Sequence, residues 1–114
     1  NSAAPRASGT LESHYAPTAK VRLMSTMDWQ KALEALGPHT QNLGLWSVEK
    51  PSPELMGGGL FWRAMPANAR QAAHDVFGVL RDFDARGVRT IWIEMPPDTP
   101  DWEGVRDRLQ RAAA

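Results

Sequence analysis

Short apolar segments alternate with amphipathic segments of helical periodicity along most of this chain, and that alternation restricts the folds it can adopt. Strands that alternate with helices of this length favour a parallel sheet with helices packed on its faces. We therefore predict an α/β fold with a small, mostly parallel sheet of about four strands and helices on both faces. The predicted strands span residues 21–24, 42–48, 60–65 and 90–95. The predicted helices span about 26–36, 68–86 and 101–113.

The longest predicted helix carries a continuous apolar stripe. Its apolar residues recur at the spacing of one helix face: Ala69, Ala72, Ala73, Val76, Phe77, Leu80 and Phe83. Gly87 suits the left-handed position that ends a helix. The strand after it is rich in β-branched and aromatic residues. Four of the five tryptophans also fall where we expect burial: Trp29, Trp62, Trp92 and Trp102.

Capping residues and helix breakers mark the ends of the two shorter helices. Ser25 or Thr26 can cap the first of them, and Gly37-Pro38 stops it. Asp101 is placed to cap the last helix, because a side-chain oxygen there can accept a free amide of the first turn. The segment 49–59, with two prolines and three consecutive glycines, is predicted to be a loop.

Composition excludes several classes of function. The chain has 13 basic and 13 acidic residues, a formal net charge of +0, which argues against a protein that binds a nucleic-acid backbone. It has no cysteine, so disulfides and cysteine-ligated metal sites are excluded. No apolar run approaches the roughly 20 residues that cross a bilayer, and no signal segment is recognisable. We expect a cytoplasmic protein with no membrane or direct nucleic-acid partner.

No catalytic or metal-binding motif is recognisable in the sequence. The three histidines lack HxxxH or HExxH spacing, so we expect no metal site. Gly57-Gly58-Gly59 precedes a strand, whereas a phosphate-binding loop leads into a helix, and a flexible connection is the simpler interpretation. No serine or threonine is marked as an activated nucleophile. We therefore assign no catalytic residue and no cofactor to this chain.

Polar residues near the ends of predicted strands form a candidate ligand site. Ligands of open parallel sheets gather beyond the carboxyl ends of the strands. Glu94 ends the best-defined strand, and Ser25 and Ser47 stand at two other strand ends. A purely structural interpretation of Glu94 is that it caps a neighbouring helix or pairs with Arg63.

The first 19 residues differ in character from the rest. Pro5, Gly9 and Pro17 prevent regular structure there. We interpret residues 1–19 as an interdomain linker and 20–114 as the folded domain, and the whole as part of a longer protein. The segment holds the one tyrosine of the chain, Tyr15, beside His14. Either this is a tail of accidental composition, or these side chains serve a surface outside this chain, which is the interpretation we favour.

The residues around this pair resemble a known pattern. Residues 7–17, ASGTLESHYAP, are similar to the interdomain linker of the long-form threonylcarbamoyl-AMP synthase family. That pattern is close to Ser/Ala-Pro-Gly-Met/Thr, a few residues, then His-Tyr-Ala-Pro, and Ser8 stands where the family usually has proline. Residues 72–84, 89–94 and 107–113 are similar to the family's C-terminal helix, strand and closing helix. Residues 101–103 replace its frequent Gly-Leu-Gly turn.

The resemblance carries expectations about the whole enzyme. The family's long form has an N-terminal YrdC-like catalytic domain that makes threonylcarbamoyl-adenylate and pyrophosphate from threonine, bicarbonate and ATP, for t6A modification of tRNA. The resemblance implies that the present chain is the Rossmann-like, three-layer accessory domain, non-catalytic by itself. ATP and Mg²⁺ would belong to the catalytic domain, which would be this chain's partner. The linker would gate the cleft of that domain through Ser8, Gly9, His14 and Tyr15.

Two other functions are compatible with the sequence. The first is a stand-alone module that binds a nucleotide or another small ligand at the strand ends near Ser25, Ser47 and Glu94. The second is a protein-interaction module that works through its aromatic surface, with a homodimer as the simplest case.

Overall fold

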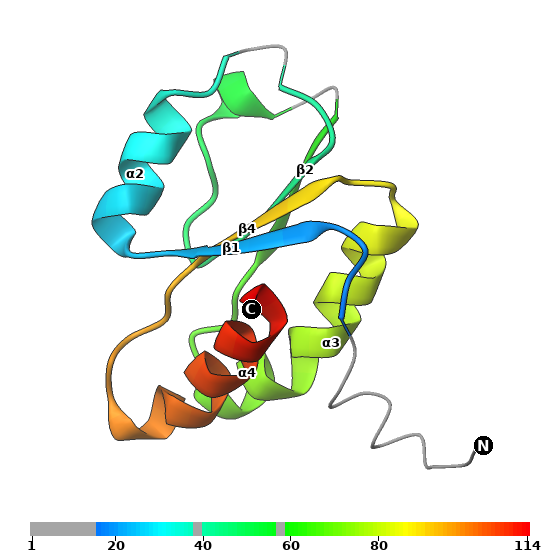
Figure 1. Ribbon diagram of the computed structural model, residues 1–114. Coiled ribbons are helices and arrows are strands. Elements are labelled where there is room, and N and C mark those ends of the chain that lie inside the picture. Colours follow the sequence, from blue (N-terminus) through cyan, green and yellow to red (C-terminus); the bar gives the residue numbers. More distant parts are fainter. Residues whose placement is uncertain (1–15, 38–39, 57–58) are drawn as a thin grey trace, which may run out of the picture.

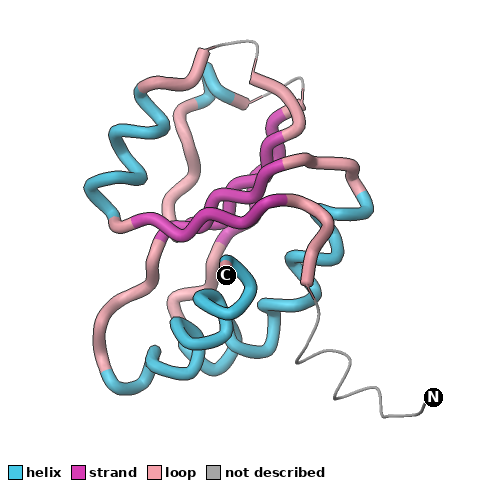
Figure 2. Tube along the Cα trace, viewed as in Figure 1, coloured by secondary structure: helices cyan, strands magenta, loops and turns pink. Residues whose placement is uncertain are grey.

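The computed structural model describes residues 16–37, 40–56 and 59–114 of the 114-residue chain. Within these described residues lie four strands and three α-helices, and a short 3₁₀ turn lies in each of two connections (Figures 1 and 2). The elements in chain order are β1 (Lys20–Met24), α2 (Thr26–Glu34), β2 (Leu43–Ser47), η1 (Pro53–Leu55), β3 (Leu60–Ala64), α3 (Ala69–Ala85), β4 (Thr90–Glu94), η2 (Pro100–Trp102) and α4 (Glu103–Ala113).

The four strands form one parallel sheet in the order β1-β4-β2-β3. Helix α2 lies on one face of the sheet, and α3 and α4 lie together on the other (Figure 1). The protein is therefore a three-layer α/β domain of Rossmann-like form, as the alternation of segments predicts. Its last strand in sequence, β4, is inserted between β1 and β2, so both neighbours pair with it.

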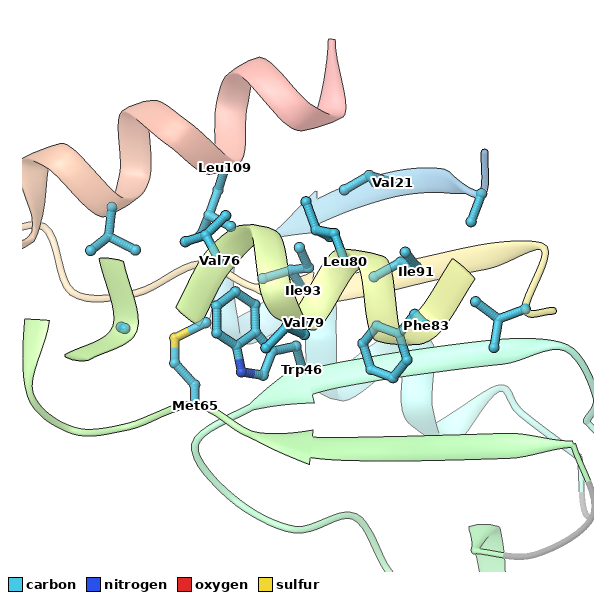
Figure 3. Packing of buried hydrophobic residues seen from close by; sticks show 14 of the residues in the cluster. Val21, Trp46, Met65, Val76, Val79, Leu80, Phe83, Ile91, Ile93 and Leu109 are labelled. Atoms are coloured by element: carbon cyan, nitrogen blue, oxygen red, sulfur yellow. The ribbon is translucent and has the colours of Figure 1, made fainter. Parts of the chain in front are cut away.

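Side-chain alternation along the strands divides the core into two layers. Ile91 and Ile93 of β4 point to the α3–α4 face and are fully buried there, whereas Trp92 packs in the layer beneath α2. Successive residues of a strand face opposite sides of a sheet, which explains this division. The α3–α4 layer is the larger one, and its buried residues include Trp46, Val76, Leu80, Phe83 and Leu109 (Figure 3).

Several local predictions are confirmed. The Ser25 hydroxyl oxygen accepts a hydrogen bond from the Asp28 amide at 3.1 Å and so caps α2. Gly87 has a φ of 77°, the left-handed conformation that follows the end of α3. The apolar stripe of α3 faces the sheet, and Val79 joins it as a further buried residue.

Other predictions are wrong in instructive ways. Asp101 does not cap the last helix: Pro100 begins the η2 turn, α4 begins only at Glu103, and the Asp101 carboxylate accepts from the Thr99 hydroxyl at 2.6 Å. Trp62 and Trp92 were expected to be buried but are only half-buried. Both pack against the core layer beneath α2, which is the smaller of the two layers. Helix α2 ends at Glu34, before the predicted stop, and η1 lies inside the predicted loop.

Candidate functional site

A cavity of about 540 Å³ lies at the carboxyl ends of the strands. Residues that follow each of the four strands contribute to its wall: Ser25 after β1, Val48 and Glu49 after β2, Met65 after β3, and the segment from Glu94 to Asp98 at the end of β4. The first turn of α2 closes one side with Thr26. Its volume is within the range of small-molecule sites.

The chain connections explain why a crevice forms here. After β1 the chain passes to α2 on one face, whereas after the adjacent β4 it passes to α4 on the other face (Figure 1). Two neighbouring connections that diverge in this way leave a gap above the strand ends, which is where open α/β sheets bind ligands. The Met95 amide donates to the Met24 carbonyl at 2.7 Å, so β1 and β4 remain hydrogen-bonded to each other where they end at the cavity.

The structure brings Ser25 and Glu94 together but not Ser47. Ser25 and Glu94 both line the cavity. Ser47 is fully buried: its hydroxyl donates to the Glu49 carbonyl at 2.8 Å and accepts from the Trp62 indole at 3.0 Å. The role of Ser47 is therefore to join the β2 end to Trp62 of β3.

Glu94 is half-buried at the cavity wall. Its proposed pairing with Arg63 is wrong, because the Arg63 guanidinium binds Asp82 of α3 at 2.9 Å instead. Arg63 and Glu94 lie on opposite faces of the sheet, since side chains alternate along β3 and β4.

The cavity has an acidic lining. Its ionisable residues are Glu49, Glu94 and Asp98, and neither lysine nor arginine is among the described residues that line it. Arg106 pairs with Asp98 from outside the lining. Within the described part of the chain, no cluster of acidic and histidine side chains is arranged to hold a metal ion. Such a cavity repels a phosphate group and attracts a cationic one. Glu49 directly follows the strand predicted over residues 42–48, and that position was the signal that could have identified it.

A second polar arrangement surrounds the point where the chain enters the fold. We use the term linker stem for residues 16–19. The Thr18 and Ala19 amides donate to the two carboxylate oxygens of Asp84, at 3.0 and 3.2 Å. The Lys20 amide then donates to the Arg89 carbonyl at 2.9 Å. Asp84 lies in the last turn of α3, so the stem is attached to that end of the helix.

Asp82, one half-turn before Asp84, is held by two arginines. Its carboxylate accepts from Arg63 at 2.9 Å and from Arg86 at 3.2 Å. Partial burial raises the pKa of Asp82, but the hydrogen bonds from Arg86 and Arg63 outweigh that effect and hold the pKa below its ordinary value. The Arg86 guanidinium also lies 5.3 Å from the ring centroid of Phe61.

The predicted linker residues Ser8, Gly9, His14 and Tyr15 lie outside the described residues. The same holds for His39 and for Gly57-Gly58. The stem lies at the amino end of β1 (Figure 2), and this is where the predicted linker would meet the domain. The cavity lies at the opposite end of the sheet. The linker and the cavity are therefore two separate candidate sites.

Comparison with protein families identifies the domain. The family model described as the C-terminal domain of threonylcarbamoyl-AMP synthase matches residues 1–114, which include the predicted linker residues. The chain belongs to this family. A search of curated proteins and a search of solved structures each found no significant match.

Membership of the threonylcarbamoyl-AMP synthase C-terminal family agrees with the resemblance seen in the linker and in the segments of α3, β4 and α4. None of the helices in the described part of the chain combines the length and the apolar character needed to cross a membrane.

Proposed function

We propose that this chain is the accessory domain and linker of a threonylcarbamoyl-AMP synthase, and that the linker gates the cleft of a catalytic domain ahead of it. The observation that carries the proposal is the family match over the whole chain, linker included. The attachment of the linker stem to Asp84 supports it, because a gating segment needs one fixed end.

The chemistry would belong to the catalytic domain, which is this chain's proposed partner. That domain binds threonine, bicarbonate and ATP with Mg²⁺, forms threonylcarbamoyl-AMP and releases pyrophosphate, a nucleotidyltransferase reaction that serves t6A modification of tRNA in the cytoplasm. The present chain contributes no catalytic residue and no direct contact with tRNA. Its balanced charge, +0, supports the second point.

The linker acts by covering the reactants. Tyr15 offers a flat apolar face and one hydrogen-bonding group, and His14 offers a second such group next to it. A segment laid over a cleft excludes water and retains an adenylate that water would hydrolyse. Ser8 stands where the family usually has proline.

Activity measurements on the full-length enzyme test this function. We expect Tyr15→Ala and Tyr15→Phe to slow formation of threonylcarbamoyl-AMP, with the larger loss in Tyr15→Ala because it removes the ring as well as the hydroxyl. His14→Ala has a matched control in His74→Ala, since the His74 side chain is 83% exposed on α3. Wild-type rates in both Tyr15 variants contradict the gating function.

A second function, binding of a small ligand by the domain itself, is favoured by the cavity that joins Ser25 to Glu94. The acidic lining favours an amine-bearing ligand such as free threonine over ATP or AMP. The positive end of the α2 dipole lies at Ser25, so an amino acid would meet favourable charges for both of its ionised groups. Calorimetry of the 114-residue chain with threonine, AMP and ATP tests this function. Heat from threonine alone supports it, and no heat from any of the three contradicts it.

A further inference from the structure

Strand β1 lies at one edge of the sheet. In the order β1-β4-β2-β3 it has β4 on one side, and no described strand lies on its other side. The Lys20 amide donates to the Arg89 carbonyl at 2.9 Å, which places the backbone groups of Lys20 on the side of β4. Alternate residues of a parallel strand bond to the same neighbour. The N–H and C=O groups of Val21 and Leu23 therefore face the open edge.

A shallow groove of about 350 Å³ lies at this edge. Its lining comes from the middle of β1 and the end of α4: Val21, Arg22, Leu23, Gln110, Ala113 and Ala114. The last turns of α4 lie beside β1 (Figure 1), and the small alanine side chains leave room next to the strand. Leu23 is half-buried and packs against the α3–α4 layer, which gives the groove an apolar wall.

The opposite face of β1 is basic. Lys20 and Arg22 are exposed there, because successive side chains of a strand point to opposite faces. Neither of them forms an ion pair with another described residue. The other edge strand, β3, also carries an arginine, but the Arg63 guanidinium binds Asp82 at 2.9 Å. Among the described residues, unpaired positive charge thus marks the β1 edge and not the β3 edge.

These charges determine which kind of strand fits the open edge. Charged side chains on an edge strand discourage pairing between copies of a protein. If two copies of β1 paired antiparallel about Arg22, the two Arg22 side chains would face each other, and like charges directly opposite are destabilising. An acidic strand would instead place its carboxylates beside Lys20 and Arg22. Its alternate side chains would then lie on the other face, against Leu23 and the end of α4.

We propose that the outer edge of β1 binds an extended segment of a partner protein in which acidic and apolar residues alternate. The segment adds to the sheet as a further strand, and its backbone pairs with Val21 and Leu23. Its apolar side chains enter the groove, and its carboxylates face Lys20 and Arg22. Backbone pairing provides the binding and the charges select the partner. The inference is independent of the gating function, because it depends only on β1 and α4.

Titration of the 114-residue chain with a blocked peptide of alternating glutamate and valine, as long as β1, tests the docking site. We expect the peptide to bind and to slow hydrogen exchange at the Val21 and Leu23 amides, which gain acceptors. The same peptide with methylated backbone nitrogens lacks the donors of a strand, and we expect it not to bind. Absence of binding by the unmethylated peptide, or binding that leaves exchange at both amides unchanged, overturns the proposal.

Reversal of one charge tests how the partner is selected. We expect Arg22→Glu to weaken binding of the glutamate–valine peptide about tenfold or more, and to strengthen binding of a lysine–valine peptide. The Arg22 side chain is exposed, so the core is unaffected. Arg70→Glu is the matched control, because Arg70 is an exposed arginine of α3 outside the groove and should leave both affinities unchanged. Equal effects of the two variants overturn the proposal. Arg22-dependent binding of a single-stranded RNA, with no binding of the acidic peptide, also overturns it.

Discussion

Gly44 of β2 and Phe83 of α3 are in such close contact that no side chain fits between them. A Cβ atom at Gly44 would lie 2.8 Å from Cδ1 of Phe83, well inside the separation at which carbon atoms attract. Phe83 is fully buried, and Gly44 pairs with Ile91 at the centre of the sheet. The missing side chain therefore lets the Phe83 ring lie directly on the sheet (Figure 3).

Gly44→Ala should destabilise the domain. The added methyl group must displace the Phe83 ring or the β2 backbone in a packed core, which costs about 1–3 kcal/mol. Thermal or denaturant unfolding measures the change. Gly78→Ala is the matched control, because nothing lies within 4 Å of a Cβ at that exposed position of α3, and alanine there should stabilise the helix by up to about 1 kcal/mol. Equal stabilities of the two variants would contradict the packing described here.

Asp82 should stabilise the domain at neutral pH and lose that effect in acid. Its pKa in the folded protein is lowered from the ordinary value of 3.8, so the unfolded state binds the proton more tightly. The contribution is therefore complete above that ordinary value and disappears as the pH falls through the lower folded value. We expect Asp82→Asn to be less stable than wild type at pH 7, by no more than about 1 kcal/mol for so exposed a pair. Unfolding curves at pH 7 and pH 2.5 test this, and a difference that persists in acid contradicts it.

Ser47→Ala should weaken the join between β2 and β3. It leaves the Trp62 indole N–H without its buried acceptor, and an unpaired buried polar group costs about 1–3 kcal/mol. Ser52→Ala serves as the control, since the exposed Ser52 oxygen caps only the short η1 turn at 3.4 Å. Chemical denaturation of both variants decides the point, and equal effects would show that the buried bond has no special weight.

Glu94→Gln should weaken binding of an amine-bearing ligand in the cavity. It removes one negative charge from a half-buried wall position without changing its size. If threonine binds there, its affinity should fall several-fold in calorimetry. Glu54→Gln on the η1 turn, outside the lining, is the control. Unaltered affinity in Glu94→Gln would place the ligand elsewhere.

The order of elements could be predicted because each depends on local pattern. The α3 stripe, the Ser25 cap and the left-handed Gly87 are all signals within a few residues. Strand order could not be predicted, because the pairing of β1 with β4 joins residues about 70 positions apart in sequence. The start of α4 was misplaced because Pro100 allows a 3₁₀ turn before the helix.

Only some residues of the candidate site could be predicted from the sequence. Ser25 and Glu94 could be predicted together, since the carboxyl ends of parallel strands meet at one edge. Ser47 is also at a strand end, but its side chain points into the α2 layer, where it binds Trp62. That contact depends on the register between β2 and β3, which could not be predicted from the sequence. The contact of Asp84 with the linker stem joins distant residues through backbone amides, and such a contact leaves no periodic or compositional signal.

The central claim is that the linker covers the substrates of the catalytic domain. The most direct measurement is hydrogen exchange at residues 8–15 of the full-length enzyme, with and without threonine, bicarbonate and Mg²⁺-ATP. We predict that these amides, and Tyr15 above all, exchange more slowly once the substrates are bound. Exchange at residues 8–15 that does not change while the catalytic domain becomes protected would contradict the account.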